Sequence, residues 1–232
     1  MDAKLLGLVG ALGTASAAGG TYLFMSNSKN SSAIFELFKS EKGLKLITND
    51  SDSQWDTAWK KYRADHLENQ IYKEKDLWNI SNWSEKKTSE SAFDEFKREC
   101  KKRFDIKVRG IDSKEYKEVK KYCSRAKTVS ELLSENKSKT LLDKAGDEGG
   151  WNAAWKTYKE ANIQSNTGSA ITYKTTDIWQ VTGWNHSSPR DTAIEGYKTK
   201  CEEKWNSYID PDKWTSDTIF QQVESWCTKT PS

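Results

Sequence analysis

The side chains of this chain that could do acid–base chemistry are carboxylates that recur at matched places in its two halves. Paired carboxylates can act as general acid and general base in hydrolysis. Most of these acids are expected at helix starts or on solvated helix faces, and only Asp76 and Asp177 fall beside short link segments. We therefore expect Asp76 and Asp177 to cap or hydrogen-bond the link segments, and we expect no catalytic residue. The matched acids are Glu36 and Glu131, Asp76 and Asp177, Glu90 and Asp191, and Asp94 and Glu195.

Histidines and known catalytic motifs add no further candidate. The chain of 232 residues has two histidines, His66 and His186, which do not correspond between the halves and have no second histidine or Cys-x-x-Cys motif nearby. We expect both of them at the surface. No glycine-rich phosphate loop, His-Glu-x-x-His motif or nucleophile elbow occurs in the sequence. The sequence therefore predicts a protein that is not an enzyme and holds no metal or cofactor.

The 11 tryptophans are the remaining candidates for a site, because an indole ring can either fill a core or stack on a ligand. Tryptophans at helical spacing are interpreted as core residues: Trp55, Trp59, Trp151 and Trp155. The link segments 77–83 and 178–184 carry four more, for which a core position is favoured and a stacking platform is the alternative. That ligand platform would consist of Trp78, Trp83, Trp179 and Trp184.

The chain after residue 30 repeats one unit. One group of residues recurs 96 positions later: Trp55, Ala58, Trp59 and Tyr62 match Trp151, Ala154, Trp155 and Tyr158. A second group recurs at an offset of 101: Asp76, Trp78, Trp83 and Cys100 match Asp177, Trp179, Trp184 and Cys201. Val119 and Cys123 match Val223 and Cys227 at an offset of 104. The offset only increases along the chain, as small loop insertions produce, so the pattern indicates two tandem copies.

Within each copy the apolar residues follow a helical period. The set Trp55, Ala58, Trp59 and Tyr62 forms one stripe at i, i+3, i+4 and i+7. Thr128 stands three residues before Glu131, which predicts a capping box at a helix start. The predicted fold class is mainly α, with an N-terminal transmembrane helix followed by two tandem four-helix repeat units, each with one disulfide. The predicted domains are 1–30 (anchor or signal segment with a short tether), 31–126 (first copy) and 127–232 (second copy).

The amino terminus contains a segment suited to a membrane. The 21 residues from Leu5 to Met25 carry no charge, and as a helix they would span about 30 Å, the thickness of a bilayer core. The alternatives are a signal peptide cleaved near Ala15-Ser16-Ala17 and a buried soluble helix. Lys4 and Lys29 flank the segment on opposite sides, so charge alone does not set its orientation.

The four cysteines favour an oxidising compartment. Two cysteines fall in each copy, which predicts the disulfides Cys100–Cys123 and Cys201–Cys227. Such bridges suit small units exported from the cytoplasm. The alternatives are reduced, buried cysteines and a four-cysteine zinc site, and the latter is disfavoured because no Cys-x-x-Cys spacing exists.

The charge distribution gives little support for a nucleic-acid partner. The net charge is +3, and the run Lys97–Arg109 holds seven basic residues against Glu99 and Asp105. Its counterpart in the second copy, Lys198–Lys204, is mixed in sign. We therefore interpret the run as a solvated helix face.

Three further features carry a resemblance: the Thr128–Leu133 sequence TVSELL, the motif Trp-x-x-x-Trp-x-x-Tyr, and the late Trp226-Cys227 pair. Together with the short apolar amino terminus, they resemble the large paralogous families of uncharacterised proteins in haemotropic mycoplasmas. The resemblance implies a membrane-associated, surface-displayed protein of unassigned activity that is proposed to vary antigenically, and it carries no catalytic residues.

The functional expectation is thus a single-pass protein of the cell membrane, held in the lipid bilayer by Leu5 to Met25, with its C-terminal region extracellular. Its role would be interaction or antigenic display. The alternative is an adhesin module that binds a host surface protein or a glycan through the link-segment tryptophans. No cofactor and no nucleic acid are expected, and the sequence leaves the binding partner, the cleavage of the amino-terminal segment and the oligomeric state open.

Overall fold

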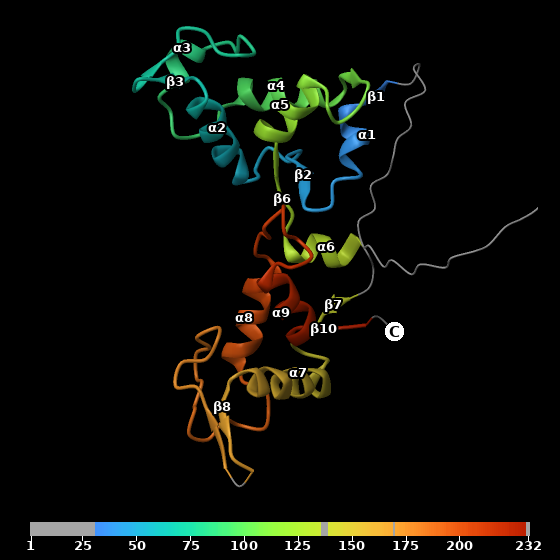
Figure 1. The fold of residues 1–232 in the computed structure, drawn as a ribbon, viewed down its shortest axis with the longest axis vertical. Helices are drawn as coiled ribbons and strands as arrows, with labels where there is room; N and C mark the ends of the chain where they lie inside the picture. Colours follow the sequence, from blue (N-terminus) through green and yellow to red (C-terminus); the bar gives the residue numbers. More distant parts are fainter. Residues whose placement is uncertain (1–30, 136–138, 169, 231–232) are drawn as a thin grey trace, which may run out of the picture. The chain divides into compact units, whose positions relative to one another are not determined.

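A computed structural model describes residues 31–135, 139–168 and 170–230 of the chain (Figure 1). The segment predicted as a membrane-spanning helix, Leu5 to Met25, lies outside these residues. Within the described ranges, no helix is both long and apolar enough to cross a lipid bilayer.

The first copy consists of short helices separated by very short strands. Its elements are β1 (Ser32–Ala33), α1 (Ile34–Phe38), β2 (Leu44–Leu46), α2 (Gln54–Ala64), β3 (Leu67–Glu68), β4 (Ile71–Tyr72), α3 (Trp83–Lys86), α4 (Asp94–Phe104), β5 (Lys107–Val108), α5 (Lys114–Tyr122) and β6 (Ser124–Ala126). The strands pair antiparallel in three two-stranded sheets, β1 with β5, β2 with β6 and β3 with β4.

The second copy follows the same plan. Its elements are α6 (Val129–Glu135), β7 (Thr140–Leu141), α7 (Glu148–Ala161), β8 (Ile163–Asn166), β9 (Ile171–Tyr173), α8 (Glu195–Trp205), α9 (Thr218–Trp226) and β10 (Thr228–Lys229). Strand β7 pairs with β10, and β8 pairs with β9. An antiparallel bridge between Thr128 and Tyr208 stands where the first copy has β1 and β5.

The prediction of a mainly α fold, with a transmembrane helix ahead of two four-helix units, is wrong. Helices hold 41% of the described residues and strands 14%, and the strands form small antiparallel sheets. The sheets exist because the ends of the helices leave backbone groups that need partners. The Ile34 amide donates to the Ile106 carbonyl (3.0 Å), and the Ile47 amide donates to the Cys123 carbonyl (3.0 Å). The second copy repeats both contacts from Val129 and from Leu142.

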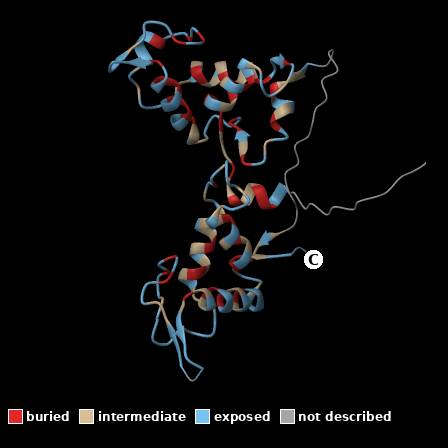
Figure 2. Ribbon diagram, in the orientation of Figure 1, coloured by how far each residue is buried: buried red, intermediate tan, exposed pale blue. Residues whose placement is uncertain are grey.

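Each copy has its own hydrophobic core of aromatic rings. In the first core Trp59 lies against Tyr62 and Phe96, with ring centroids 5.9 and 5.0 Å apart. In the second core Trp155 lies against Tyr158 and Tyr197 at 5.6 and 5.0 Å. Buried residues alternate with exposed ones along the helices (Figure 2), as the helical period predicts. The indole N–H groups of the four core tryptophans, Trp55, Trp59, Trp151 and Trp155, all donate to backbone carbonyls.

The disulfide prediction is confirmed. Cys100 of α4 is bonded to Cys123 at the end of α5, and Cys201 of α8 is bonded to Cys227 at the end of α9. The Cα atoms are 5.5 Å apart in both pairs, and all four residues are fully buried. Each bridge therefore joins the last two helices of its copy.

Candidate functional site

A buried carboxylate organises the link segment of the first copy. Asp76 is 6% exposed, and its side chain accepts three hydrogen bonds. The Tyr62 hydroxyl and the Trp78 amide (2.9 Å) donate to one oxygen, and the Ile80 amide (2.9 Å) donates to the other. The carboxylate thus joins α2 to the turn that follows it in the chain.

The second copy has the same arrangement around Asp177, which is 4% exposed. The Tyr158 hydroxyl, the Trp179 amide (3.1 Å) and the Val181 amide (3.0 Å to one oxygen) donate to it. The expectation that both aspartates hydrogen-bond the link is confirmed.

These contacts define what the two aspartates can do chemically. Burial, together with the hydrogen bond to Asp76, holds the pKa of Tyr62 well above its ordinary value. Burial and the bond to Asp177 do the same for the pKa of Tyr158. Both hydroxyls therefore stay protonated and donate permanently, so the carboxylates serve as structural acceptors.

The other matched acids do not converge on one place but form separate ion pairs. Glu36 pairs with Lys39, Glu90 with Arg63, Asp191 with Lys159, and Glu195 with Lys144. Glu131 belongs to the junction described below, and Asp94 lies exposed in the first turn of α4. A two-carboxylate catalytic arrangement has no support from this geometry.

The tryptophans of the link segments face inward. Trp78, Trp83 and Trp179 are buried, with 9%, 4% and 7% of their surface exposed, and Trp184 is half-buried. The Trp78 indole donates to Glu118 (3.0 Å), and the Trp179 indole donates to Gln222 (2.8 Å). Because a stacking platform needs open ring faces, the structure gives the platform of Trp78, Trp83, Trp179 and Trp184 no support.

Trp83 and Trp184 complete the same core from the far end of the link. Their indole N–H groups donate to the carbonyls of Lys73 and Lys174, both at 2.9 Å. The rings meet Trp59 and Trp155 edge to face, with centroids 5.8 Å apart in both copies. The link tryptophans therefore fix the hairpins β3–β4 and β8–β9 to the cores.

The expectation that both histidines lie at the surface is wrong for His66, which is 7% exposed. His186 is exposed as expected. The His66 side chain bonds the Tyr62 carbonyl through Nδ1 (2.7 Å), and its Nε2 accepts from the Leu77 amide (2.8 Å). The sequence contains a signal for this buried position. Asn162 stands 96 positions after His66, which is the offset that relates the core tryptophans of the two copies, so the two residues correspond.

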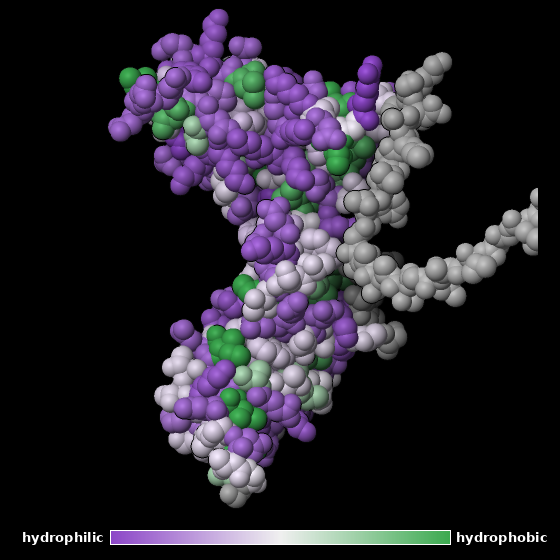
Figure 3. Space-filling view, viewed as in Figure 1, coloured by the Kyte–Doolittle hydropathy of each residue, from purple (hydrophilic) through white to green (hydrophobic). Residues whose placement is uncertain are grey.

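Exposed aliphatic residues gather beside the link and the hairpin in both copies. Leu77 is 40% exposed and Ile178, its counterpart, is 39% exposed. Leu67 and Ile71 of the hairpin β3–β4 are 42% and 72% exposed, and Ile171 of β9 is 51% exposed. Figure 3 shows hydrophobic residues at the surface where hairpin β3–β4 lies. We call Leu67, Ile71 and Leu77 the link–hairpin face of the first copy, and Ile171 and Ile178 the link–hairpin face of the second.

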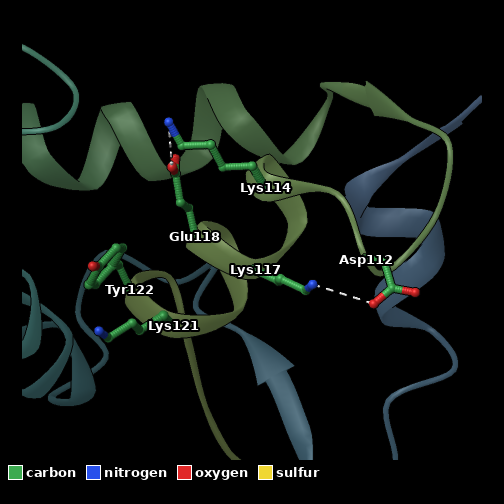
Figure 4. Close-up of a pocket in the computed structure, with 6 residues that line it drawn as sticks. All are labelled: Asp112, Lys114, Lys117, Glu118, Lys121 and Tyr122. Carbon is green, nitrogen blue, oxygen red and sulfur yellow. Dashed lines mark ion pairs between the residues drawn. The ribbon is translucent and has the colours of Figure 1, made fainter.

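A shallow depression of about 350 Å³ lies on the outer side of α5 (Figure 4). It is lined by Asp112, Lys114, Lys117, Glu118, Lys121 and Tyr122. Its lysines face acids: Lys114 pairs with Glu118 (3.7 Å), Lys117 with Asp112 (3.4 Å), and Lys121 with Asp65. Each of the three lysines is thus paired with an acid of the lining or next to it, so the depression offers no concentrated charge to a ligand.

The basic run Lys97–Arg109 is matched by neighbours in the same way. Lys101 pairs with Asp50 (2.6 Å), Lys102 pairs with Glu99 (2.7 Å), and the Arg103 guanidinium lies 4.1 Å from the centroid of the Trp78 ring. These contacts favour the interpretation of the run as a solvated helix face.

Arg125 joins the two copies. Its guanidinium pairs with Asp52 of the first copy (2.7 Å) and with both carboxylate oxygens of Glu131 in the second (2.7 and 2.8 Å), and it lies over the Tyr208 ring. Burial would raise the pKa of Glu131, but hydrogen bonds from Arg125, the Thr128 amide and Lys45 lower it to about 2. The Glu131–Thr128 contact is the capping box predicted for α6, and Thr128 Oγ1 accepts from the Glu131 amide in return (3.2 Å).

One glycine shows how closely the copies approach. A Cβ atom on Gly43 would lie 2.3 Å from the carbonyl oxygen of Pro211 in the second copy, so no larger residue fits there. The Lys127 amide donates to the Gly43 carbonyl (2.9 Å). The short connection Ser124–Lys127 predicts that the copies share an interface, but the residues of this junction carry no sequence signal, because Arg125 and Gly43 belong to no repeated motif.

Comparison of the chain with protein-family models, with curated proteins and with solved structures found no match.

Proposed function

We propose that this chain is a non-catalytic protein displayed outside the cytoplasm, where its surface serves interaction or antigenic display. One observation carries the proposal: the two copies keep the same buried contacts while their outer faces differ in charge. A scaffold whose core is fixed and whose surface is free to diverge suits a protein that presents its surface to partners.

Helices α4 and α8 show this divergence most clearly. The buried pair Phe96 and Cys100 corresponds to Tyr197 and Cys201, which occupy the same core positions. On the outer side, Lys101 and Lys102 correspond to Glu202 and Glu203, a reversal of charge.

Helices α5 and α9 differ in the same way. Val119 and Cys123 are retained as Val223 and Cys227, and all four are fully buried. The outer residues Lys114, Lys117 and Lys121 become Thr218, Gln221 and Ser225. The depression on α5 therefore has no charged counterpart on α9.

The two disulfides support a position outside the cytoplasm, because such bridges persist in oxidising compartments. The resemblance to the paralogous families of haemotropic mycoplasmas points in the same direction. A glycan-binding role through the link tryptophans has lost its support, since their rings are packed in the cores. A protein contact would instead use the link–hairpin faces and the outer sides of the helices.

Labelling of intact cells tests the proposed display. A membrane-impermeant amine reagent should modify exposed lysines such as Lys39 and Lys102, whose side chains are 68% and 70% exposed. We expect these lysines to be labelled on intact cells to the same extent as after lysis. A cytoplasmic protein of the same cells is the control and should be labelled only after lysis. Labelling of Lys39 and Lys102 only after lysis would contradict the proposal.

A further inference from the structure

We propose that the first copy carries an acid-sensitive latch at His66, and that the second copy lacks it because Asn162 takes the same place. In this latch, the imidazole of His66 fastens the beginning of the link segment to α2 only while the ring is neutral. Mild acid would release this fastening in the first copy alone.

His66 and Asn162 make the same backbone hydrogen bonds in the two copies. The His66 amide donates to the Arg63 carbonyl (2.9 Å), and the Asn162 amide donates to the Lys159 carbonyl (3.0 Å). Their own carbonyls accept from the amides of Lys73 and Lys174, both at 2.9 Å. Each residue thus lies just after the end of its helix and receives the chain that returns from its hairpin.

Their side chains also make equivalent hydrogen bonds. In the second copy, the Asn162 amide group donates to the Tyr158 carbonyl (2.9 Å), and its oxygen accepts from the Ile178 amide (2.8 Å). In the first copy, Nδ1 and Nε2 of His66 make the same two bonds, to the Tyr62 carbonyl and from the Leu77 amide. An asparagine and a neutral histidine are therefore interchangeable here.

The partners determine which nitrogen of His66 carries the hydrogen. A backbone carbonyl can only accept, so Nδ1 must donate to Tyr62, and a backbone amide can only donate, so Nε2 must present a lone pair to Leu77. A proton added to Nε2 would place two N–H groups against each other. The Leu77 amide would lose its acceptor.

The charged groups around His66 do not replace the lost acceptor. Arg63 lies in the last turn of α2, Asp65 directly follows this helix, Lys73 follows β4, and Asp76 precedes Leu77 in the link. Lys121 of α5 pairs with Asp65. Asp65 attracts a positive imidazole, but its carboxylate is held by the Lys121 ammonium and the Tyr122 hydroxyl. Asp76 already accepts from Tyr62, Trp78 and Ile80. Neither carboxylate is therefore available to accept from Nε2.

Release of the Leu77 amide would loosen the part of the first copy that carries exposed aliphatic residues. Leu77 follows Asp76 directly, and Leu67 follows His66. The latch thus connects the protonation of one ring to the mobility of the link–hairpin face of the first copy. Asn162 does not titrate, so the second copy keeps its link fastened in acid.

Amide hydrogen exchange in the full chain tests the latch, with the rates corrected for the intrinsic effect of pH. Between about pH 8 and about pH 5, where histidine titrates, we expect the protection of the Leu77 amide to fall about tenfold, the effect of one lost hydrogen bond. The Ile178 amide is the internal control and should keep its protection. A Leu77 amide whose protection does not change would overturn the proposal.

Two exchanged variants complete the test. His66→Asn places the residue of the second copy in the first, so it should fold and should abolish the response at Leu77. Asn162→His should transfer an equal response to Ile178. If His66→Asn retains the acid response, or if the unaltered chain responds equally at Ile178, a global effect of acid and not His66 is responsible, and the latch is refuted.

Discussion

Replacement of Asp76 by alanine is expected to lower the free energy of unfolding of the first copy by roughly 4 kcal/mol, because three buried donors lose their hydrogen bonds to one carboxylate together. These donors are the Tyr62 hydroxyl and the amides of Trp78 and Ile80. Water cannot easily replace the carboxylate, since Asp76 is 6% exposed and Tyr62 and Trp78 are also buried. The loss would weaken the attachment of the link segment to α2, which would then depend on the bonds of the Leu77 amide to His66 and of the Trp78 amide to the Tyr62 hydroxyl.

Chemical denaturation followed by tryptophan fluorescence measures this effect. Asp177→Ala is the matched variant and should destabilise the second copy by a similar amount. Asp112→Ala is the control: Asp112 is 97% exposed in its ion pair with Lys117, and surface pairs contribute less than about 1 kcal/mol. An Asp76→Ala variant that is no less stable than Asp112→Ala would show that the carboxylate does not hold the link.

Removal of one disulfide has the second large expected effect. The bridge Cys100–Cys123 spans 23 residues and the bridge Cys201–Cys227 spans 26. Loops of this size stabilise a fold by roughly 3 kcal/mol through the loss of entropy in the unfolded chain. Because the two loops are so similar, the variants Cys100→Ala/Cys123→Ala and Cys201→Ala/Cys227→Ala should each lose about this amount.

Thermal unfolding of both variants and of the unaltered chain, with and without reductant, distinguishes the bridge from the side-chain change. Reductant should lower the unfolding midpoint of the unaltered chain by breaking both bridges. In each double variant, reductant can act only through the bridge that remains. If neither double variant differs from the unaltered chain, the bridges contribute nothing to stability and this account of the fold is incorrect.

The sequence predicted the positions of residues best where the same residue type recurs at a helical spacing or at the offset between the two copies. Trp59 and Trp155 could be assigned to cores because each lies on an apolar stripe at the same place in its copy. The cysteines could be paired because two fall on matched helices in each copy. The link aspartates Asp76 and Asp177 could be recognised as structural because they stand beside segments that leave the helical period.

The strands were missed for a physical reason. Ser32–Ala33 and Lys107–Val108 contain two residues each, so no alternation of apolar and polar residues can reveal them. Their pairing is decided by backbone groups left free at the ends of neighbouring helices, and these groups carry no sequence signal. Strand β2 has three residues and the same limitation.

His66 was misplaced because a lone histidine was compared with His186 and not with the residue at the repeat offset. Asn162 provides that comparison, since both side chains combine one donor with one acceptor. The junction at Arg125 could not be found from the repeat, because a contact between copies has no counterpart within a copy. Its partners Asp52, Glu131 and Tyr208 are far apart in the sequence.

The divergence of outer residues around a retained core is the feature that connects fold and proposed role. Lys101 and Lys102 against Glu202 and Glu203 reverse the charge of a helix face while Cys100 and Cys201 beneath them make the same bridge. The Tyr62–Asp76 and Tyr158–Asp177 contacts are retained in the same way. Such a scaffold can change its surface without loss of the interactions that stabilise it.

One disulfide closes each copy, and the proposed display outside the cytoplasm requires that both bridges are oxidised in the native cell. Both points can be examined by peptide mapping with mass spectrometry under non-reducing conditions, on protein taken from its native cells with free thiols blocked at lysis. We expect peptides that join Cys100 to Cys123 and Cys201 to Cys227, with no blocked thiol at any of the four. Four blocked thiols, or bridges that join one copy to the other, would contradict this account.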